Sequence, residues 1–262
     1  MVNPKKSLGQ NFLIDQNILK KIVEVTNITK KSILEVGPGT GNLTSYILKK
    51  KPNKFYLIEK DERLISILKN EFKEKVMIIN DDILKINEKK IDNEKLIVFG
   101  NLPYNISTEI LCKWILNLDD KKIWFNNLIL MFQKEVADRI ISKYNSSQYG
   151  RLSILANWKL DIEKICDIKP GSFHPKPKVD SSLLFFKPKK EYYSFKNPKN
   201  LEMITRLFFN QRRKMLQKPF NQLFNGNLEI SKKFKINLDL RPQNLHQDIY
   251  YELTKEYEKL KI

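Results

Sequence analysis

The chain has 262 residues, of which 41% are hydrophobic, so it can form one large domain or a large domain with a small companion. It carries 48 Lys and Arg against 30 Asp and Glu, a net charge of +18. Such an excess favours a polyanionic partner, a nucleic acid or an anionic membrane surface, although abundant Lys, Asn and Ile are also typical of nucleotide-composition bias.

Targeting and metal-binding signals are not found in the sequence. No apolar run approaches the roughly 20 residues of a membrane span, and the first residues lead into no signal-peptide core. We therefore expect a cytoplasmic protein with no membrane association. Cys112, Cys166, His174 and His246 lack ligand spacing, so we expect no disulfide and no metal.

The N-terminal residues 5–14 are basic and polar, with Gly9 before the pair Gln10 and Asn11. They precede a predicted helix with Asp15 as N-cap and one apolar face made of Ile18, Leu19, Ile22 and Val23. The segment is either an arm packed on the domain or a flap whose polar groups reach a ligand, and the sequence favours neither.

A glycine-rich turn follows the first predicted strand, residues 33–36, and precedes a helix through Leu43 and Ile47. Glycines there let a ligand approach the backbone. The dinucleotide fingerprint G-x-G-x-x-G is broken by Asn42, and no Gly-Lys-Ser/Thr of a phosphate loop follows. The remaining pattern, Glu35 with alternating glycines at 37, 39 and 41, resembles the first motif of class I S-adenosylmethionine methyltransferases; a plain structural turn is the alternative.

Acidic residues end the next two predicted strands, residues 54–58 and 76–79. Glu59 is placed to accept hydrogen bonds from a ribose diol, as in Rossmann-type sites, unless it is one exposed acid among several. Asp82 stands next to Ile83, so we expect this pair to hold an adenine by its amine and its face; Asp81 is the less favoured acid.

The fourth predicted strand, residues 96–99, leads into Asn101-Leu102-Pro103-Tyr104. Pro103 cannot continue a strand, so this motif should lie at the carboxyl end, where open α/β sheets bind ligands. Its amide, its proline-held carbonyl and its aromatic face are the parts needed to hold a flat base with an exocyclic amine. Taken alone, a strand-to-helix turn with an incidental Tyr explains it as well.

Strands and helices keep alternating through a fifth strand, residues 128–132, which indicates a parallel sheet with helices on both faces. Segments 158–168 and 179–186 are also predicted strands. The short, proline-containing connection between them leaves no room for a crossover helix, so we expect antiparallel pairing. Phe173, in that connection, is either a loop anchor for the core or a stacking platform.

The composition changes at residues 187–190, a predicted linker, and helices are expected over 201–208 and from 210 onward. Residues 187–218 carry ten Lys and Arg against Glu191 and Glu202, a net charge of +8. This run is either a solvated charged face or a contact to a nucleic-acid backbone, which we favour.

Seven segments together resemble the KsgA family of small-subunit ribosomal RNA adenine dimethyltransferases, in order along nearly the whole chain. They lie at residues 9–13, 35–41, 101–107, 133–136, 149–153, 173–181 and 210–214. Departures are mild: Gln243 and His246 replace an acid and a serine that are usual in the family, which puts C-terminal packing or RNA contacts in doubt.

The resemblance implies a Rossmann-like class I S-adenosylmethionine methyltransferase domain over residues 1–187 and a small helical RNA-binding domain over 188–262. It implies dimethylation of two adjacent adenosines near the 3′ end of 16S ribosomal RNA, with a pre-30S particle as partner, a monomeric enzyme and S-adenosylhomocysteine as product. The implied cofactor contacts are Asn11, Leu13, Gly37, Gly39, Glu59, Asp82 and Asn101. The implied base pocket is formed by Asn101, Pro103, Tyr104 and Phe173.

The expected chemistry needs orientation rather than a protein nucleophile. The Asn101 side-chain oxygen and the Pro103 carbonyl would each accept one hydrogen bond from the adenine amine, while Tyr104 and Phe173 hold the extruded base by stacking. Two other functions remain open: large-subunit ribosomal RNA adenine methylation, and a non-enzymatic assembly or transcription factor built on the same fold.

Overall fold

The computed structural model describes residues 3–5, 8–118 and 123–260. The chain forms two compact units. Unit 1 comprises Met1–Lys113, Leu118–Ala137 and Asp161–Pro188, and unit 2 comprises Trp114–Asn117, Asp138–Leu160 and Lys189–Ile262. The domain boundary that we place at residue 187 stays a prediction. None of the helices in the described ranges is long and apolar enough to cross a bilayer.

Unit 1 is built on a seven-stranded sheet of order β4-β3-β2-β5-β6-β9-β7. In chain order the strands are β2 (Ser32–Val36), β3 (Lys54–Glu59), β4 (Met77–Asn80), β5 (Leu96–Asn101), β6 (Phe125–Gln133), β7 (Leu160–Ile168) and β9 (Ser181–Pro188). Neighbours from β4 to β6 pair in parallel, and β9 pairs antiparallel with β6. The predicted, mostly parallel α/β sheet is therefore confirmed.

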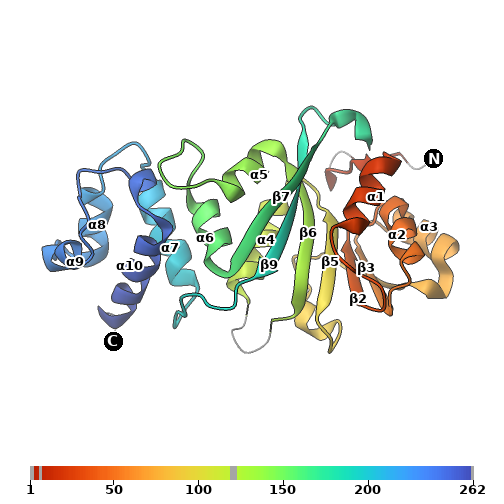
Figure 1. Ribbon diagram of the computed structural model, residues 1–262, viewed down its shortest axis with the longest axis horizontal. Helices are drawn as coiled ribbons and strands as arrows, with labels where there is room; N and C mark the ends of the chain where they lie inside the picture. The colour runs from red at the N-terminus through yellow and green to blue at the C-terminus, as the bar shows by residue number, and fades with distance from the viewer. Residues whose placement is uncertain (1–2, 6–7, 119–122, 261–262) are drawn as a thin grey trace. The chain divides into compact units, whose positions relative to one another are not determined.

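Helices follow the strands, as parallel pairing requires. They are α1 (Gln16–Glu24), α2 (Asn42–Lys49), α3 (Glu62–Phe72), α4 (Ser107–Leu116) and α5 (Lys134–Ile141), with short 3₁₀ turns at Lys73–Lys75, Glu88–Lys90 and Pro170–Ser172. Figure 1 shows α1, α2 and α3 beside the β2–β3 half of the sheet. The interior strand β2 is buried at every residue, because helices cover both faces of such a sheet. Asp15 caps α1 as predicted, accepting from the backbone N–H groups of Asn17 and Ile18.

A second, two-stranded sheet ties the N-terminal segment to the connection between β7 and β9. Strand β1 (Phe12–Leu13) pairs antiparallel with β8 (Phe173–His174), so that Leu13 lies opposite Phe173. Two segments about 160 positions apart in sequence are thereby joined at one edge of the unit.

Unit 2 is helical, with α6 (Arg151–Lys159), α7 (Lys199–Phe209), α8 (Gln217–Phe224), α9 (Leu228–Lys233), α10 (Gln247–Leu260) and a 3₁₀ turn at Pro242–Asn244. Its core is aromatic. Buried Tyr250 packs against Phe208 and Phe209, with ring centroids 5.6 and 5.7 Å apart, and donates to Pro242 O. Buried Tyr251 donates to Ile154 O, so the hydroxyls of Tyr250 and Tyr251 are both satisfied within the unit.

Three local predictions were wrong. Helix α6 was not predicted, and Trp158 and Lys159 belong to it, so strand β7 starts only at Leu160. Residues 210–214 form turns after α7, and the next helix begins at Gln217. Helix α6 is buried on nearly all sides, so its sequence shows no apolar period, and residues 210–214 are polar and mostly exposed, so no apolar period marks a helix there.

Candidate functional site

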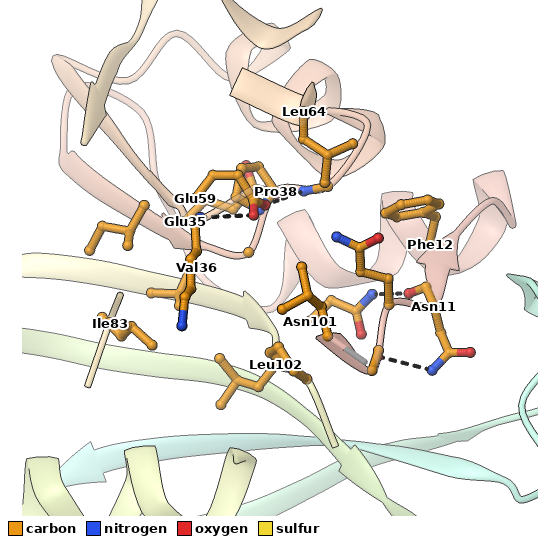
Figure 2. A pocket seen from close by; sticks show the side chains of 18 of the residues that line it. Asn11, Phe12, Glu35, Val36, Pro38, Glu59, Leu64, Ile83, Asn101 and Leu102 are labelled. Atoms are coloured by element: carbon orange, nitrogen blue, oxygen red, sulfur yellow. Dashed lines mark hydrogen bonds between the residues drawn. The ribbon is translucent and has the colours of Figure 1, made fainter. Parts of the chain in front are cut away.

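A cavity of about 260 Å³ lies in unit 1 where strands β2, β3, β4 and β5 end. Figure 2 shows Asn11 and Phe12 on one side of it, Glu35, Glu59 and Ile83 on the other, and Asn101 between them. The structure brings together every predicted site residue except Phe173. The lining includes Asn11, Leu13, Gly37, Gly39, Glu59, Asp82, Asn101, Pro103 and Tyr104.

The turn after β2 forms the floor of this cavity. Gly37 and Gly39 have φ values of +68° and +60°, a left-handed conformation that side chains rarely adopt. A Cβ on Gly39 would also lie 2.7 Å from Phe12 Cδ1. The turn therefore excludes side chains for two reasons, and its backbone stays open to a ligand on the cavity side.

Glu59, the last residue of β3, presents one carboxylate oxygen to the cavity. Its Oε1 accepts two backbone N–H groups, from Lys60 and Asp61, both at 2.9 Å. Its Oε2 accepts only a long bond of 3.4 Å from Gly39 N among the hydrogen bonds described. Burial raises the pKa of Glu59, while the backbone bonds oppose that shift. Oε2 thus keeps acceptor capacity for a hydroxyl-bearing ligand.

Glu35 is a second buried carboxyl in the cavity wall, and sequence reasoning did not assign it an individual role. It is 2% exposed, and its Oε2 accepts from Thr44 Oγ1 at 2.7 Å. Burial raises its pKa to about 8, opposed by the Thr44 hydrogen bond and assisted by the nearby charge of Glu59. The signal available in the sequence was an acid in the middle of an otherwise apolar strand.

Asp82 follows β4, the strand next to β3, and also lines the cavity. Its Oδ2 accepts from Lys60 Nζ at 2.8 Å and its Oδ1 from Leu84 N at 3.0 Å. The Lys60 hydrogen bond is the main reason that its pKa is lowered, so Asp82 is ionised at neutral pH. Ile83 beside it is buried and lines the cavity, which leaves an acceptor and an apolar face adjacent, as predicted for adenine.

Asn101 is oriented by the N-terminal segment. Its Nδ2 donates to Asn11 O at 2.7 Å, which leaves Oδ1 as the acceptor. Pro103 O accepts from Ile106 N at 3.1 Å and retains a second lone pair. The Tyr104 hydroxyl lies 2.6 Å from Ser181 Oγ, and burial raises the pKa of Tyr104. Ser181, the first residue of β9, is a positioning contact that the sequence did not predict.

The N-terminal segment is both packed on the domain and part of the cavity wall. Gln10 Nε2 donates to Asp61 Oδ2 at 3.0 Å, and Asn42 Nδ2 donates to Leu13 O at 2.7 Å. Asp61 is 3% exposed, and hydrogen bonds from Arg63 hold its pKa well below the usual range. The segment is hydrogen-bonded to the first residue of α2 and to the N-cap residue of α3. It is therefore an arm packed on the domain and also a wall whose polar groups can reach a ligand.

Phe173 does not line the cavity. It is 3% exposed and belongs, with Leu13, to the hydrophobic core cluster of unit 1. In this conformation the ring anchors the core, and stacking on a base would require it to leave that environment. Its stacking role stays a prediction that this geometry does not support.

Metal binding has no candidate cluster here. In the parts of the chain that the structure describes, no three His, Cys, Asp or Glu side chains are grouped as metal ligands.

Comparisons with known proteins agree on one family. The sequence model described as "Ribosomal RNA adenine dimethylase" matches residues 1–259. The chain is 64% identical over 260 residues to a protein of Pelagibacter ubique named "Ribosomal RNA small subunit methyltransferase A", covering 99% of each. A relative of the same name from Ehrlichia ruminantium is 43% identical over 249 residues, covering 94% of each.

Solved structures show the same fold. A dimethyladenosine transferase from Plasmodium falciparum superposes with a TM-score of 0.79 at 28% identity, covering 96% of this chain and 98% of that one. The 23S rRNA methyltransferase ErmE superposes with a TM-score of 0.69 at 20% identity, covering 95% and 99%; at that identity it supports the fold alone.

Proposed function

The chain belongs to the ribosomal RNA adenine dimethylase family, and from this premise we propose that it dimethylates two adjacent adenosines near the 3′ end of 16S ribosomal RNA. It is an S-adenosylmethionine-dependent ribosomal RNA adenine dimethyltransferase, acting on the small subunit. One observation carries the site assignment: Asn101 Nδ2 is bonded to Asn11 O, so Oδ1 remains as an acceptor beside the cavity.

The residues of the cavity fit S-adenosylmethionine. The positive-φ turn at Gly37 and Gly39 offers open backbone, and Glu59 Oε2 offers an acceptor for a ribose diol. Asp82 and Ile83 offer an acceptor and an apolar face for adenine, and Asn11 and Leu13 complete the wall. When bound, this cofactor supplies an electrophilic methyl group on a sulfonium.

The protein's own contribution is to orient the target amine. The lone pair of an adenine amine is delocalised into the ring, which makes it a poor nucleophile. Asn101 Oδ1 and Pro103 O would each accept one N–H and hold the nitrogen towards tetrahedral geometry. Tyr104, held by Ser181, would stack on the extruded base. Positioning of this kind needs no Ser, Cys or His nucleophile.

Unit 2 supplies a surface suited to the RNA. The predicted basic run, residues 187–218, includes the turns after α7, where Arg213 and Lys214 are exposed. Arg212 Nε donates to Gln243 Oε1 at 3.1 Å, which joins this turn to the segment before α10. Nearby, half-exposed Tyr144 meets His246 edge to face with ring centroids 4.9 Å apart. Cations beside an exposed aromatic ring suit phosphates and unstacked bases.

The finer setting is also part of this proposal. The relatives named small subunit methyltransferases support a pre-30S particle as the substrate. A monomer working in the cytoplasm is part of the same proposal. Light scattering on purified protein tests the oligomeric state.

The decisive experiment is mass spectrometry of ribosomal RNA incubated with the protein and cofactor. We expect two dimethyladenosines in small-subunit RNA from methyl-deficient particles. Modification of large-subunit RNA alone would refute the substrate. Binding of pre-30S particles without any methyl transfer would favour the non-enzymatic alternative.

A further inference from the structure

Lys113, near the end of α4, is the centre of a hydrogen-bond cluster outside the cavity. Its Nζ donates to Ile83 O at 2.7 Å, to Ile86 O at 2.6 Å and to Glu88 Oε1 at 2.6 Å. The Lys113 side chain is 17% exposed and that of Glu88 7%. This is therefore a shielded cluster and not a surface ion pair of the kind that contributes little.

The three bonds use the full donor capacity of the ammonium group, which has three N–H and no acceptor. Two of the acceptors are main-chain carbonyls between β4 and β5 that no helix or strand satisfies. Removing Lys113 would take a bonded cation from both carbonyls and from a buried carboxylate at once, and such losses are costly.

The segment that Lys113 holds is also a wall of the cavity. Residues 81–84 line the cavity, and Ile83 is 6% exposed within it. On the cavity side the segment is held by the Lys60–Asp82 ion pair at 2.8 Å, in which the Lys60 side chain is 61% exposed. Of the two lysines that hold this segment, Lys113 is thus better shielded from solvent than Lys60.

Lys113 further connects this wall to the base-holding motif. Helix α4 begins at Ser107, directly after residues 101–106, which line the cavity from the other side. Ile106 N donates to Pro103 O, and Ser107 Oγ to Tyr104 O, so the helix start is bonded to the motif. One helix therefore touches both halves of the site.

We propose that Lys113 is a positioning residue that fixes the segment 81–88, of which residues 81–84 form the adenine-facing wall, relative to the base-holding motif and thereby sets affinity for the cofactor. This inference rests on the proposed function, in which Asp82 and Ile83 receive the adenine of S-adenosylmethionine. A preformed wall binds the cofactor more tightly, because the wall then loses less conformational entropy when the ligand binds.

The test compares full-length Lys113→Met and Lys113→Arg with Lys69→Met, a control that removes an exposed lysine from α3 of the same unit. Titration calorimetry measures affinity for S-adenosylmethionine and S-adenosylhomocysteine, and hydrogen exchange measures protection of residues 81–88. We expect Lys113→Met to bind both about tenfold more weakly, with a raised cofactor KM but kcat nearly unchanged at saturation. Amides over 81–88 should exchange faster, and the control should match the wild type.

Lys113→Arg keeps the charge and guards against a misfolded Met variant. A planar guanidinium cannot aim three N–H groups as an ammonium does, so we expect binding about threefold weaker. Wild-type affinity and exchange in Lys113→Arg, or in a folded Lys113→Met, would overturn the proposal. Failure of the wild-type protein to bind the cofactor would instead refute the proposed function.

Discussion

Replacing Glu35 by Gln should change how stability depends on pH. Glu35 is 2% exposed and burial raises its pKa to about 8, against the ordinary value of 4.5 for a glutamate in an unfolded chain. Between these two values the folded protein keeps a proton that the unfolded chain has released. The free energy of unfolding must therefore fall as pH rises through that window, and level off above pH 8.

The size of this effect follows from the two pKa values. Each pH unit within the window lowers the free energy of unfolding by about 1.4 kcal/mol, so the full penalty is about 5 kcal/mol and roughly half of it falls between pH 6 and pH 8.5. Gln cannot ionise, yet its carbonyl oxygen can accept the Thr44 Oγ1 hydrogen bond that Glu35 accepts at 2.7 Å. The variant should lack this penalty and keep the local packing.

Urea denaturation of the cofactor-free proteins, followed by circular dichroism at pH 6, 7, 8 and 8.5, measures the difference. Contributions from all other groups cancel between the wild type and Glu35→Gln. Glu71→Gln, at an exposed carboxyl on α3, is the matched control and should run parallel to the wild type. Parallel curves for Glu35→Gln as well would refute the reasoning that burial keeps Glu35 protonated.

Three further predictions concern the cavity. Asn101→Ala should lower methyl transfer by about 100-fold because the amine loses its acceptor; full activity in a folded variant would contradict the assignment. Tyr104→Phe should keep most activity, since the ring can still stack, but it should lose about 1 kcal/mol of stability with the Ser181 hydrogen bond. Tyr104→Ala should lose activity, because the ring is gone. Equal losses of activity in the two variants would exclude stacking. Cofactor affinity should weaken as pH falls through the raised pKa of Glu59, because a protonated carboxyl loses acceptor capacity. If calorimetry shows the same acid dependence in Glu59→Gln, another group must be responsible for the loss of affinity.

Local patterns predicted the strand ends of the site well. Glu59 and Asn101 follow apolar runs that can only be buried strands, and the carboxyl ends of parallel strands meet at one edge of a sheet. Their convergence on one cavity follows from topology alone. The helix after Asp15 was equally accessible, because its cap and its apolar period are both local.

Contacts between distant segments could not be predicted in this way. The bond from Gln10 to Asp61 joins residues 51 positions apart, and that from Tyr104 to Ser181 joins residues 77 apart. Nothing in the local sequence of either partner specifies the other. Phe173 illustrates the same limit: its aromatic ring suits a core and a stacking platform equally, and only its pairing opposite Leu13 puts it in the core.

The bond from Asn101 Nδ2 to Asn11 O also determines which bases can react. A free amide could rotate and present either its oxygen or its NH₂ group. Here one N–H of the NH₂ group donates to a main-chain carbonyl, which fixes the orientation of the amide, so its oxygen is directed to the base as an acceptor and Pro103 contributes a second acceptor. An exocyclic carbonyl, such as O4 of uracil or O6 of guanine, would place its oxygen against these two acceptor oxygens, which is repulsive. The amine of adenine can instead donate one hydrogen bond to each acceptor. The backbone of the N-terminal segment thus favours bases with an exocyclic amine without contacting them.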